Sequence, residues 1–235
     1  MNPSVTGKVH SVETFGTLDG PGIRYILFLQ GCPLRCLYCH NPDARTPDAG
    51  TEMCAGDVLA DILTYRKFIQ SGGVTLSGGE PLLQPEFALA VLEGCRENNL
   101  HTALDTSGAV PLEVSRPLLE QADLVLLDIK ALDDALCKTL TGMGNANTLA
   151  TLDYCEAIGK PVWIRHVLVP GYTLDDTRLT ALADYLKNFT VIQKVELLPF
   201  HKMGEYKWEK LDTEYLLSQT PEPTEAEVRQ ARAKF

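Results

Sequence analysis

The sequence has no apolar run of the roughly 18 residues that a membrane-spanning helix needs, and it has no long run of basic residues. Its first residues, MNPSVTGKVHSVE, lack the charged and apolar regions of a secretion signal. With 21 basic and 31 acidic residues the net charge is -10, which disfavours nucleic acids and anionic membranes as partners. Internal repeats are also absent. We therefore expect a cytoplasmic protein with no nucleic-acid or membrane partner.

The 235 residues, of which 45% are apolar, are enough to form one sizeable core. Short apolar segments alternate along the chain with longer amphipathic segments. We predict strands over residues 23–30, 73–77, 101–106, 123–130, 161–169 and 191–198. We predict helices over residues 56–70, 85–98, 112–121, 133–140, 147–158, 174–189 and 225–234. Each connection is long enough for a right-handed crossover, so the strands should form a parallel sheet.

Six strand-helix units are fewer than the eight of a closed barrel, which typically needs about 250 residues. We therefore predict an α/β fold, a partial (β/α)6 barrel forming a single domain over residues 1–235. Its core should span about residues 20–200, with a C-terminal cap over about 201–235. An open doubly wound sheet is the competing architecture. In either architecture functional side chains gather at the carboxyl ends of the strands, and polar residues follow every predicted strand.

Three of the seven cysteines, Cys32, Cys36 and Cys39, lie within eight residues in a C-x3-C-x2-C pattern. In a reducing compartment such crowding indicates metal or redox chemistry. Four kinds of site are consistent with it: covalent haem attachment, a thioredoxin-like redox pair, a zinc site completed by His40, and an iron-sulfur cubane with one iron free of protein ligands. The remaining cysteines are predicted to be small buried apolar side chains: Cys54, Cys95, Cys137 and Cys155.

The cysteine spacing resembles that of the radical S-adenosylmethionine (SAM) superfamily. The surrounding segments, residues 17–24 and 28–42, are similar to the activating enzymes of glycyl radical enzymes. The similarity extends from about residue 7 to about residue 211 and is strongest to the enzymes that act on pyruvate formate-lyase. It includes Tyr65-Arg66, Ser77-Gly78-Gly79-Glu80, Leu104-Asp105-Thr106, Leu127-Asp128-Ile129-Lys130, Trp163-Ile164-Arg165, Val169-Pro170-Gly171 and the run from Glu196 to His201.

This resemblance implies a barrel of the radical SAM type and an oxidoreductase reaction. A reduced 4Fe-4S cluster would cleave SAM to methionine and a 5′-deoxyadenosyl radical. The radical would remove a hydrogen atom from one glycine of pyruvate formate-lyase, in anaerobic glucose metabolism. The implied cofactors are the cluster, SAM and a monovalent cation. The implied partners are pyruvate formate-lyase as protein substrate and flavodoxin or a similar electron donor, with the activase itself a monomer. The open side of the barrel would admit a loop of the protein substrate.

The resemblance also implies roles for individual residues near the cysteines. Cys32, Cys36 and Cys39 would bind the cluster, and Tyr38 and His40 would contact the adenine side of SAM. Gly78, Gly79 and Glu80 would meet the methionyl ammonium group, because glycines permit close backbone approach and the carboxylate can take the charge.

Further roles fall at the later strand ends. Asp128 and Lys130, on either side of Ile129, point the same way on a strand. They are either an ion pair, or Asp128 contacts the ribose or a cation while Lys130 contacts the SAM carboxylate. Arg165 is either a buried partner within the sheet or a ligand of that carboxylate. His201 is similar to the family histidine that contacts SAM.

Asp105 and Thr106 form either a helix N-cap or the oxygen ligands of a monovalent cation beside SAM. We expect structural roles for three other histidines: His10, His101 and His166. The C-terminal residues, including Tyr206 and Trp208, either contact the partner or only cap the barrel.

Residues 41–72 contain a single cysteine, Cys54, so they lack ligands for the second cluster site that several related activases carry in an inserted segment. This favours the pyruvate formate-lyase type. The activases of anaerobic ribonucleotide reductase are a rival, although those chains are commonly shorter. Two other functions stay open: a zinc-stabilised binding protein, and a radical SAM enzyme that acts on a small molecule.

Overall fold

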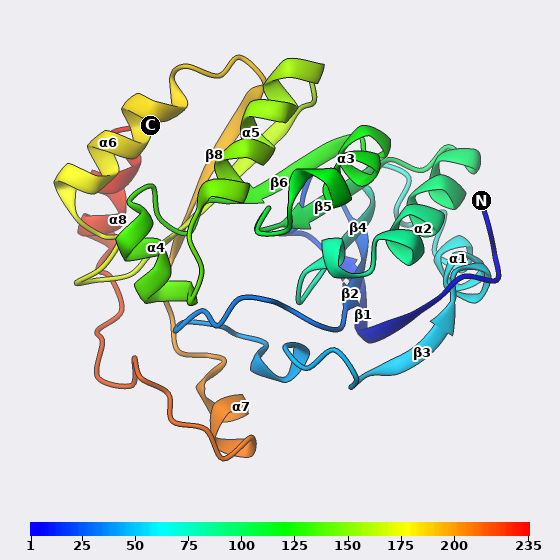
Figure 1. Ribbon diagram of the computed structural model, residues 1–235, viewed down its shortest axis with the longest axis horizontal. Coiled ribbons are helices and arrows are strands. Elements are labelled where there is room, and N and C mark those ends of the chain that lie inside the picture. Colours follow the sequence, from blue (N-terminus) through cyan, green and yellow to red (C-terminus); the bar gives the residue numbers. More distant parts are fainter.

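Buried apolar strands form the centre of the protein, whose computed structural model describes residues 1–235 (Figure 1). Six of them are parallel and lie in chain order across the sheet. They are β2 (Arg24–Leu29), β4 (Gly73–Gly78), β5 (Thr102–Thr106), β6 (Leu124–Asp128), β7 (Val162–Leu168) and β8 (Ile192–Pro199). This confirms the six predicted strands and the partial (β/α)6 barrel, with strand ends that shift by at most two residues.

Two further strands extend the sheet beyond β2, and the sequence analysis missed both. β1 (Thr6–Gly16) pairs antiparallel with β2, and β3 (Thr51–Cys54) pairs antiparallel with β1. Both strands bury few apolar residues. Val9 is the only large apolar side chain of β1 that is buried, and no residue of β3 is buried. The complete order is β3-β1-β2-β4-β5-β6-β7-β8, so β3 and β8 are the two edges and the sheet stays open.

The helices follow the predicted segments closely, with three exceptions. The first, α1, ends at Thr64 instead of Gln70, and the sixth, α6, is shorter at both ends than the predicted 174–189. A short helix after β8, α7, was not predicted. The helices are α1 (Ala55–Thr64), α2 (Pro85–Glu97), α3 (Leu112–Gln121), α4 (Asp134–Thr141), α5 (Ala146–Ile158), α6 (Asp176–Leu186), α7 (Glu205–Lys210) and α8 (Glu225–Arg232), with 3-10 turns η1 (Pro42–Ala44) and η2 (Pro81–Leu83). None of these helices is long and apolar enough to cross a membrane.

Two apolar clusters bear on the position of the site. The main core of 33 buried residues lies between the sheet and the helices that cover it. A second cluster of 12 buried residues joins the cysteine loop to α4 and to the C-terminal segment. It contains Cys36 and Tyr38 from the loop, Leu140 from α4, and Trp208 and Tyr215 from the chain after β8. The C-terminal segment therefore packs directly against the loop that carries the three cysteines.

Candidate active site

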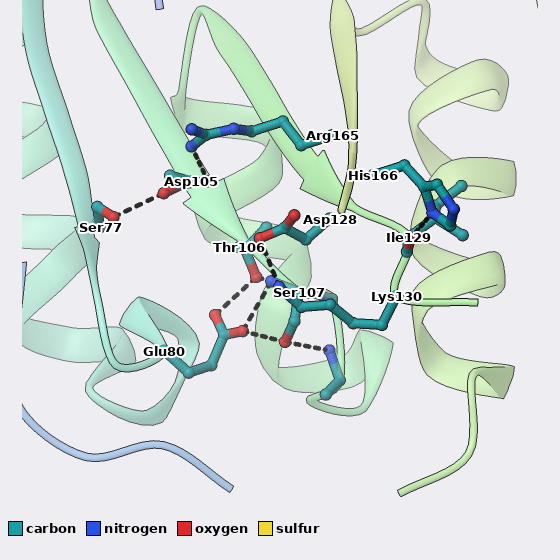
Figure 2. A network of polar contacts seen from close by, with 12 residues as sticks. Ser77, Glu80, Asp105, Thr106, Ser107, Asp128, Ile129, Lys130, Arg165 and His166 are labelled. Carbon is teal, nitrogen blue, oxygen red and sulfur yellow. Dashed lines mark hydrogen bonds and ion pairs between the residues drawn. The ribbon is translucent and has the colours of Figure 1, made fainter. Parts of the chain in front are cut away.

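The carboxyl ends of the parallel strands surround one cavity of about 510 Å³. All the predicted site residues line it, except Glu80 and Ile129. Figure 2 shows polar side chains from β4 to β7 converging in this region. A larger depression of about 640 Å³ follows the free edge of β8, but no predicted site residue lines it. We therefore take the cavity at the strand ends as the candidate active site.

The cysteine loop between β2 and η1 is held by hydrogen bonds to its backbone. Arg45 donates to the carbonyl of Cys36, with 2.6 Å between Nη2 and O. The indole Nε1 of Trp208 donates to the carbonyl of Cys39 at 2.8 Å, and the guanidinium of Arg45 lies 4.3 Å from the centre of the Trp208 ring. These donors fix the loop without engaging any thiol. Cys32, Cys36 and Cys39 are free and line the cavity.

The surroundings of the thiols suit a metal centre. Burial raises the pKa of Cys32 to about 12 and the pKa of Cys36 to about 11. Both thiols therefore stay protonated at neutral pH unless a metal replaces the proton. Lys130 and Arg45 lower the pKa of Cys36, but less than burial raises it. Three thiols, of which Cys36 lies near the positive charges of Lys130 and Arg45, fit the ligand set of an iron-sulfur cluster.

The zinc alternative is not supported by the geometry. No three His, Cys, Asp or Glu side chains converge closely enough to hold a single metal ion. His40, its fourth ligand, instead lies against His201, with ring centres 4.1 Å apart and Nε2 donating to the His201 carbonyl at 3.0 Å. A zinc site needs four ligands around one ion, whereas each cysteine of a cubane binds a different iron. The contacts of His40 with His201 therefore leave the three cysteines without the fourth ligand that a structural zinc site needs.

Gly78 and Gly79 allow two backbone segments to meet at the end of β4. The amide of Gly79 donates to the carbonyl of Leu29, and the amide of Glu80 donates to the carbonyl of Gly31, each at 2.8 Å. Gly78 has a φ of +116°, and a Cβ on either glycine would overlap with the backbone at Leu29 or Gly31. These glycines therefore join β4 to the cysteine loop, a role that we had not predicted.

Glu80 is a departure from the prediction, because its carboxylate does not face the cavity. The side chain is 1% exposed and accepts four hydrogen bonds (Figure 2). Their donors are the hydroxyl of Thr106 (2.6 Å), the amide (2.9 Å) and hydroxyl (2.5 Å) of Ser107, and the amide of Leu82 (3.3 Å). Burial raises the pKa of Glu80, and these donors oppose the rise. A carboxylate that is fully used in this way is not available to an ammonium group in the cavity.

Asp105 and Thr106 line the cavity, and their interpretation as a helix N-cap is wrong, because the next helix, α3, has Pro111 at its N-cap position. The hydroxyl of Ser77 donates to Asp105 Oδ2 at 2.6 Å. The other oxygen, Oδ1, lies 3.2 Å from Nη1 of Arg165. Burial raises the pKa of Asp105, although the guanidinium of Arg165 opposes the rise.

Asp128 and Lys130 form the ion pair that was one of the two predicted interpretations, with 2.8 Å between Oδ2 and Nζ. Burial alone would lower the pKa of Lys130, but Asp128 and the nearby Tyr38 and Cys36 raise it well above its ordinary value. Lys130 is therefore charged at neutral pH. Ile129 does not line the cavity: its side chain is in the main core, and its carbonyl accepts a hydrogen bond from Nδ1 of His166 at 2.7 Å.

Arg165 connects three carboxylates, two of which the sequence analysis missed. Its Nη1 lies 3.0 Å from Asp19 Oδ1, and its Nε lies 3.8 Å from Glu196 Oε2. Burial lowers the pKa of Arg165, but the surrounding carboxylates raise it above its ordinary value. Both missed residues lie within segments that carry the resemblance. Glu196 could also have been found from strand periodicity, since it shares a face of β8 with Leu198, another residue of the cavity wall.

The cavity is polar and acidic. Four carboxylates and two cationic side chains line it, which favours a ligand with positive charge. Several buried polar atoms of its wall have no hydrogen-bond partner: Tyr38 Oη, Asp105 Oδ1, Arg165 Nε, Glu196 Oε2 and His201 Nδ1. Asp105 Oδ1, Arg165 Nε and Glu196 Oε2 nevertheless take part in the ion pairs of Arg165. Buried polar groups are normally satisfied, so Tyr38 Oη and His201 Nδ1 are the atoms available to a bound molecule. Together with the acidic lining, these two atoms suit a ligand that carries positive charge and hydrogen-bonding groups, as SAM does.

The remaining histidines lie outside the cavity. His10 contacts Asp43 at 3.0 Å, His101 lies beside Arg24, and His166 is buried on the helix side of β7. Three of the scattered cysteines are buried as predicted, whereas Cys54 is partly exposed and contacts Asp57 at 3.1 Å.

Comparison with known proteins identifies close relatives. The model of the radical SAM superfamily matches residues 26–182. The pyruvate formate-lyase-activating enzyme of Streptococcus mutans is 46% identical over 97% of this chain and 90% of its own length. The pyruvate formate-lyase 1-activating enzyme of Escherichia coli K12 is 42% identical over 94% of this chain and 91% of its own. Among solved structures, a domain of pyruvate-formate lyase-activating enzyme from Bacteroides vulgatus has a TM-score of 0.58 and 26% identity, covering 69% of this chain and 92% of that chain.

Proposed function

We infer the reaction from the family, since the chain belongs to the radical SAM superfamily and, within it, to the pyruvate formate-lyase-activating enzymes. The cofactors of the superfamily are a 4Fe-4S cluster and SAM. When both are bound, they supply the reductive cleavage that yields methionine and a 5′-deoxyadenosyl radical, which removes a hydrogen atom from a glycine of pyruvate formate-lyase. The observation that carries this proposal is the cavity at the strand ends, where three free thiols and the unpaired polar atoms of Tyr38 and His201 lie in the wall of one space.

The protein's own residues bind and orient these groups. Cys32, Cys36 and Cys39 hold the cluster. Lys130 binds the SAM carboxylate, because it is charged and only one carboxylate pairs with it. Asp128 accepts from the ribose hydroxyls. Both side chains line the cavity as an ion pair, so a bound SAM would share Lys130 with Asp128.

The adenine side of SAM is received by aromatic residues. Tyr38, His40 and His201 all line the cavity, and the rings of His40 and His201 lie 4.1 Å apart. Burial lowers the pKa of His40, so its ring is neutral at pH 7 and can stack on a base without charge repulsion from the sulfonium. The second apolar cluster, which contains Tyr38 and Phe200, limits the access of water to this side.

Two residues have changed roles in this proposal. Arg165 is held by Asp19 and Asp105, and its Nε lies 3.8 Å from Glu196 Oε2, so it organises the acidic wall; the SAM carboxylate would share this guanidinium with them. Glu80 supports the strand ends from behind the wall. The methionyl ammonium group is instead bound by carbonyl groups near Gly78 and Gly79 and by the carboxylates of the cavity wall.

A monovalent cation is a secondary part of the proposal. Asp105, Thr106 and Asp128 all line the cavity and offer oxygen atoms. Their carboxylates already contact Arg165 and Lys130, so a cation would have to share them. SAM binding measured in potassium, sodium and tetramethylammonium buffers tests this point, and equal affinity in all three argues against the cation.

The remaining proposals concern the cellular setting. We propose a cytoplasmic monomer that takes electrons from flavodoxin or a similar donor and has no nucleic-acid or membrane partner. Residues of about 20–200 form the catalytic core, and residues of about 201–235 form the C-terminal cap.

Anaerobic reconstitution tests the proposed function. The protein should take up about four irons per chain, cleave SAM on reduction and produce a doublet electron paramagnetic resonance signal in pyruvate formate-lyase. Cys36→Ala should lose all three properties. Cys137→Ala, which removes a buried thiol outside the loop, should keep them. Full SAM cleavage by Cys36→Ala would refute the cluster assignment, and cleavage without the doublet would point to a small-molecule substrate.

A further inference from the structure

A second cavity lies on the opposite side of the parallel strands from the candidate active site. It has a volume of about 210 Å³, and its walls come from the segment after β6, from β7 and from α6. Most of the lining is apolar: Ala131, Leu132, Leu136, Ala181 and Leu182. For comparison, an apolar protein cavity of about 150 Å³ is large enough to bind benzene. The volume is therefore sufficient for a small ring compound.

One buried polar side chain faces this cavity. His166 is 4% exposed and lines its wall, and it extends from β7 to the opposite face from Arg165 (Figure 2). Its Nδ1 is hydrogen-bonded to the carbonyl of Ile129, which can only accept, so Nδ1 carries the proton. Nε2 has no hydrogen-bond partner.

The state of this imidazole determines what it can bind. Burial lowers the pKa of His166, which favours the neutral ring at pH 7. With the proton on Nδ1, Nε2 of the neutral ring is a free acceptor. The other polar groups at the cavity are used locally: Asp133 accepts from the amide of Leu136, Arg178 donates to the carbonyl of Tyr172, and the hydroxyl of Thr173 contacts the backbone at Val167 and Val169. Asp133 and Arg178 are exposed, so His166 supplies the buried acceptor of the wall that has no protein partner.

We propose that this cavity is a binding site for a small, mainly apolar molecule that carries one hydroxyl or N–H donor, received by Nε2 of His166. Burial against the apolar walls stabilises the apolar part of the ligand, and Nε2 of His166 favours ligands that carry a hydrogen-bond donor.

Such a ligand would act on the active site through a short path. His166 binds the carbonyl of Ile129, and Ile129 lies between Asp128 and Lys130, which line the candidate active site. A donor on Nε2 polarises the imidazole and strengthens its hydrogen bond to that carbonyl. The site is thus placed to adjust the position of Asp128 and Lys130 without entering the cavity that they line.

The test uses two probes of nearly equal shape, phenol and toluene, with the anaerobically reconstituted protein. Binding is followed by nuclear magnetic resonance at residues of the cavity wall. We expect both to bind saturably, and phenol to bind about three- to tenfold more tightly, the range for one additional hydrogen bond. Equal affinities for the two probes, or shifts that do not saturate, would overturn the proposal.

Two variants separate the acceptor from the cavity. His166→Leu should remove the preference for phenol while toluene still binds. Ala181→Phe should block the entrance and abolish the binding of both probes, because Ala181 lines the cavity from the exposed side of α6. Thr177→Phe, on the exposed surface of the same helix outside the cavity lining, should bind both probes normally. Unchanged phenol binding in Ala181→Phe contradicts the proposed location, even if His166→Leu fails to fold.

Discussion

At the scale of single residues, the site depends on which side chains face the cavity and which support it from behind. Glu80 and Ile129 belong to the predicted site by their place in the sequence, yet neither lines the cavity. Glu80 holds Thr106 and Ser107, and the backbone of Ile129 is held by His166. Hydrogen bonds between residues far apart in the chain decide these orientations, so a motif alone does not reveal them.

We expect Glu80→Gln to weaken SAM binding because it displaces the residues at the end of β5 that Glu80 holds in place. The amide nitrogen of glutamine cannot accept from Ser107, so at least one buried donor is left unsatisfied, at a cost of about 1–3 kcal/mol. Isothermal titration with SAM and with an analogue that lacks the amino group distinguishes the roles. We expect a similar loss of affinity for both. A loss confined to SAM would instead assign Glu80 to the ammonium group. Glu86→Gln, an exposed change on α2, is the matched control.

His166 should make the protein less stable in acid. Because burial lowers its pKa, the unfolded chain binds more protons than the folded protein once the pH falls below about 6.5, the ordinary value for histidine. The free energy of unfolding should therefore decrease on acidification, by up to about 1.4 kcal/mol per pH unit. Urea unfolding at pH 7.5 and 5.5 measures the effect.

The control for this pH dependence is His166→Gln, which keeps a donor for the carbonyl of Ile129 but does not titrate. Glu80 and Asp105, whose raised pKa values act in the opposite direction, are present in both proteins and cancel in the difference. An identical pH dependence in the two proteins would show that His166 is not held neutral.

At the scale of elements, the fold was predictable wherever apolar periodicity was strong. The strand of residues 124–128 buries four consecutive apolar side chains, as expected of a strand covered on both faces. The helix of residues 112–121 buries Leu118 and Leu119, three and four positions after the buried Ser115. β1 and β3, the two outermost strands on one side of the sheet, were missed because they bury few apolar side chains. α7 was missed because six residues with one buried side chain, Trp208, carry no helical period.

The junction between β4 and the cysteine loop depends on the absence of a side chain at Gly79. Gly79→Ala places a methyl group against the backbone of Gly31, so it should destabilise the protein by several kcal/mol and reduce iron uptake. Gly159→Ala is the control, because Gly159 also has a positive φ but its Cβ would meet nothing within 4 Å. That change should cost about 1 kcal/mol with full iron content. Thermal unfolding and iron analysis measure both, and equal losses would contradict the packing argument.

At the scale of the whole molecule, the chain that follows the open sheet packs against the cysteine loop. The segment after β8 returns to the cysteine loop, where Trp208 binds Cys39 and Lys207 binds Asn41 at 2.7 Å. α8 packs elsewhere, against α6 and β8, through Val228 and Ala231. The sequence analysis left the C-terminal segment undecided between partner contact and cap, and the contacts of α7 support a structural role at the cluster site.

Trp208→Phe should loosen the cluster without unfolding the protein. Phenylalanine fills most of the same space but cannot donate to the carbonyl of Cys39. We expect iron to be lost to a chelator several times faster than from the unaltered protein, with little change in secondary structure by circular dichroism. Tyr206→Phe, on the exposed side of α7, should release iron at the normal rate. Equal rates of iron release from the two variants would show that the hydrogen bond of Trp208 does not support the cysteine loop.

The contact between Trp208 and Cys39 spans 169 residues, which has a consequence for biosynthesis. The three thiols leave the ribosome well before Trp208, one of the donors that fix their loop, has been synthesised. A nascent chain therefore presents the cysteines before their loop has its final shape. Iron and sulfide inserted before Trp208 has been synthesised would therefore be held by a loop that still lacks one of its supports.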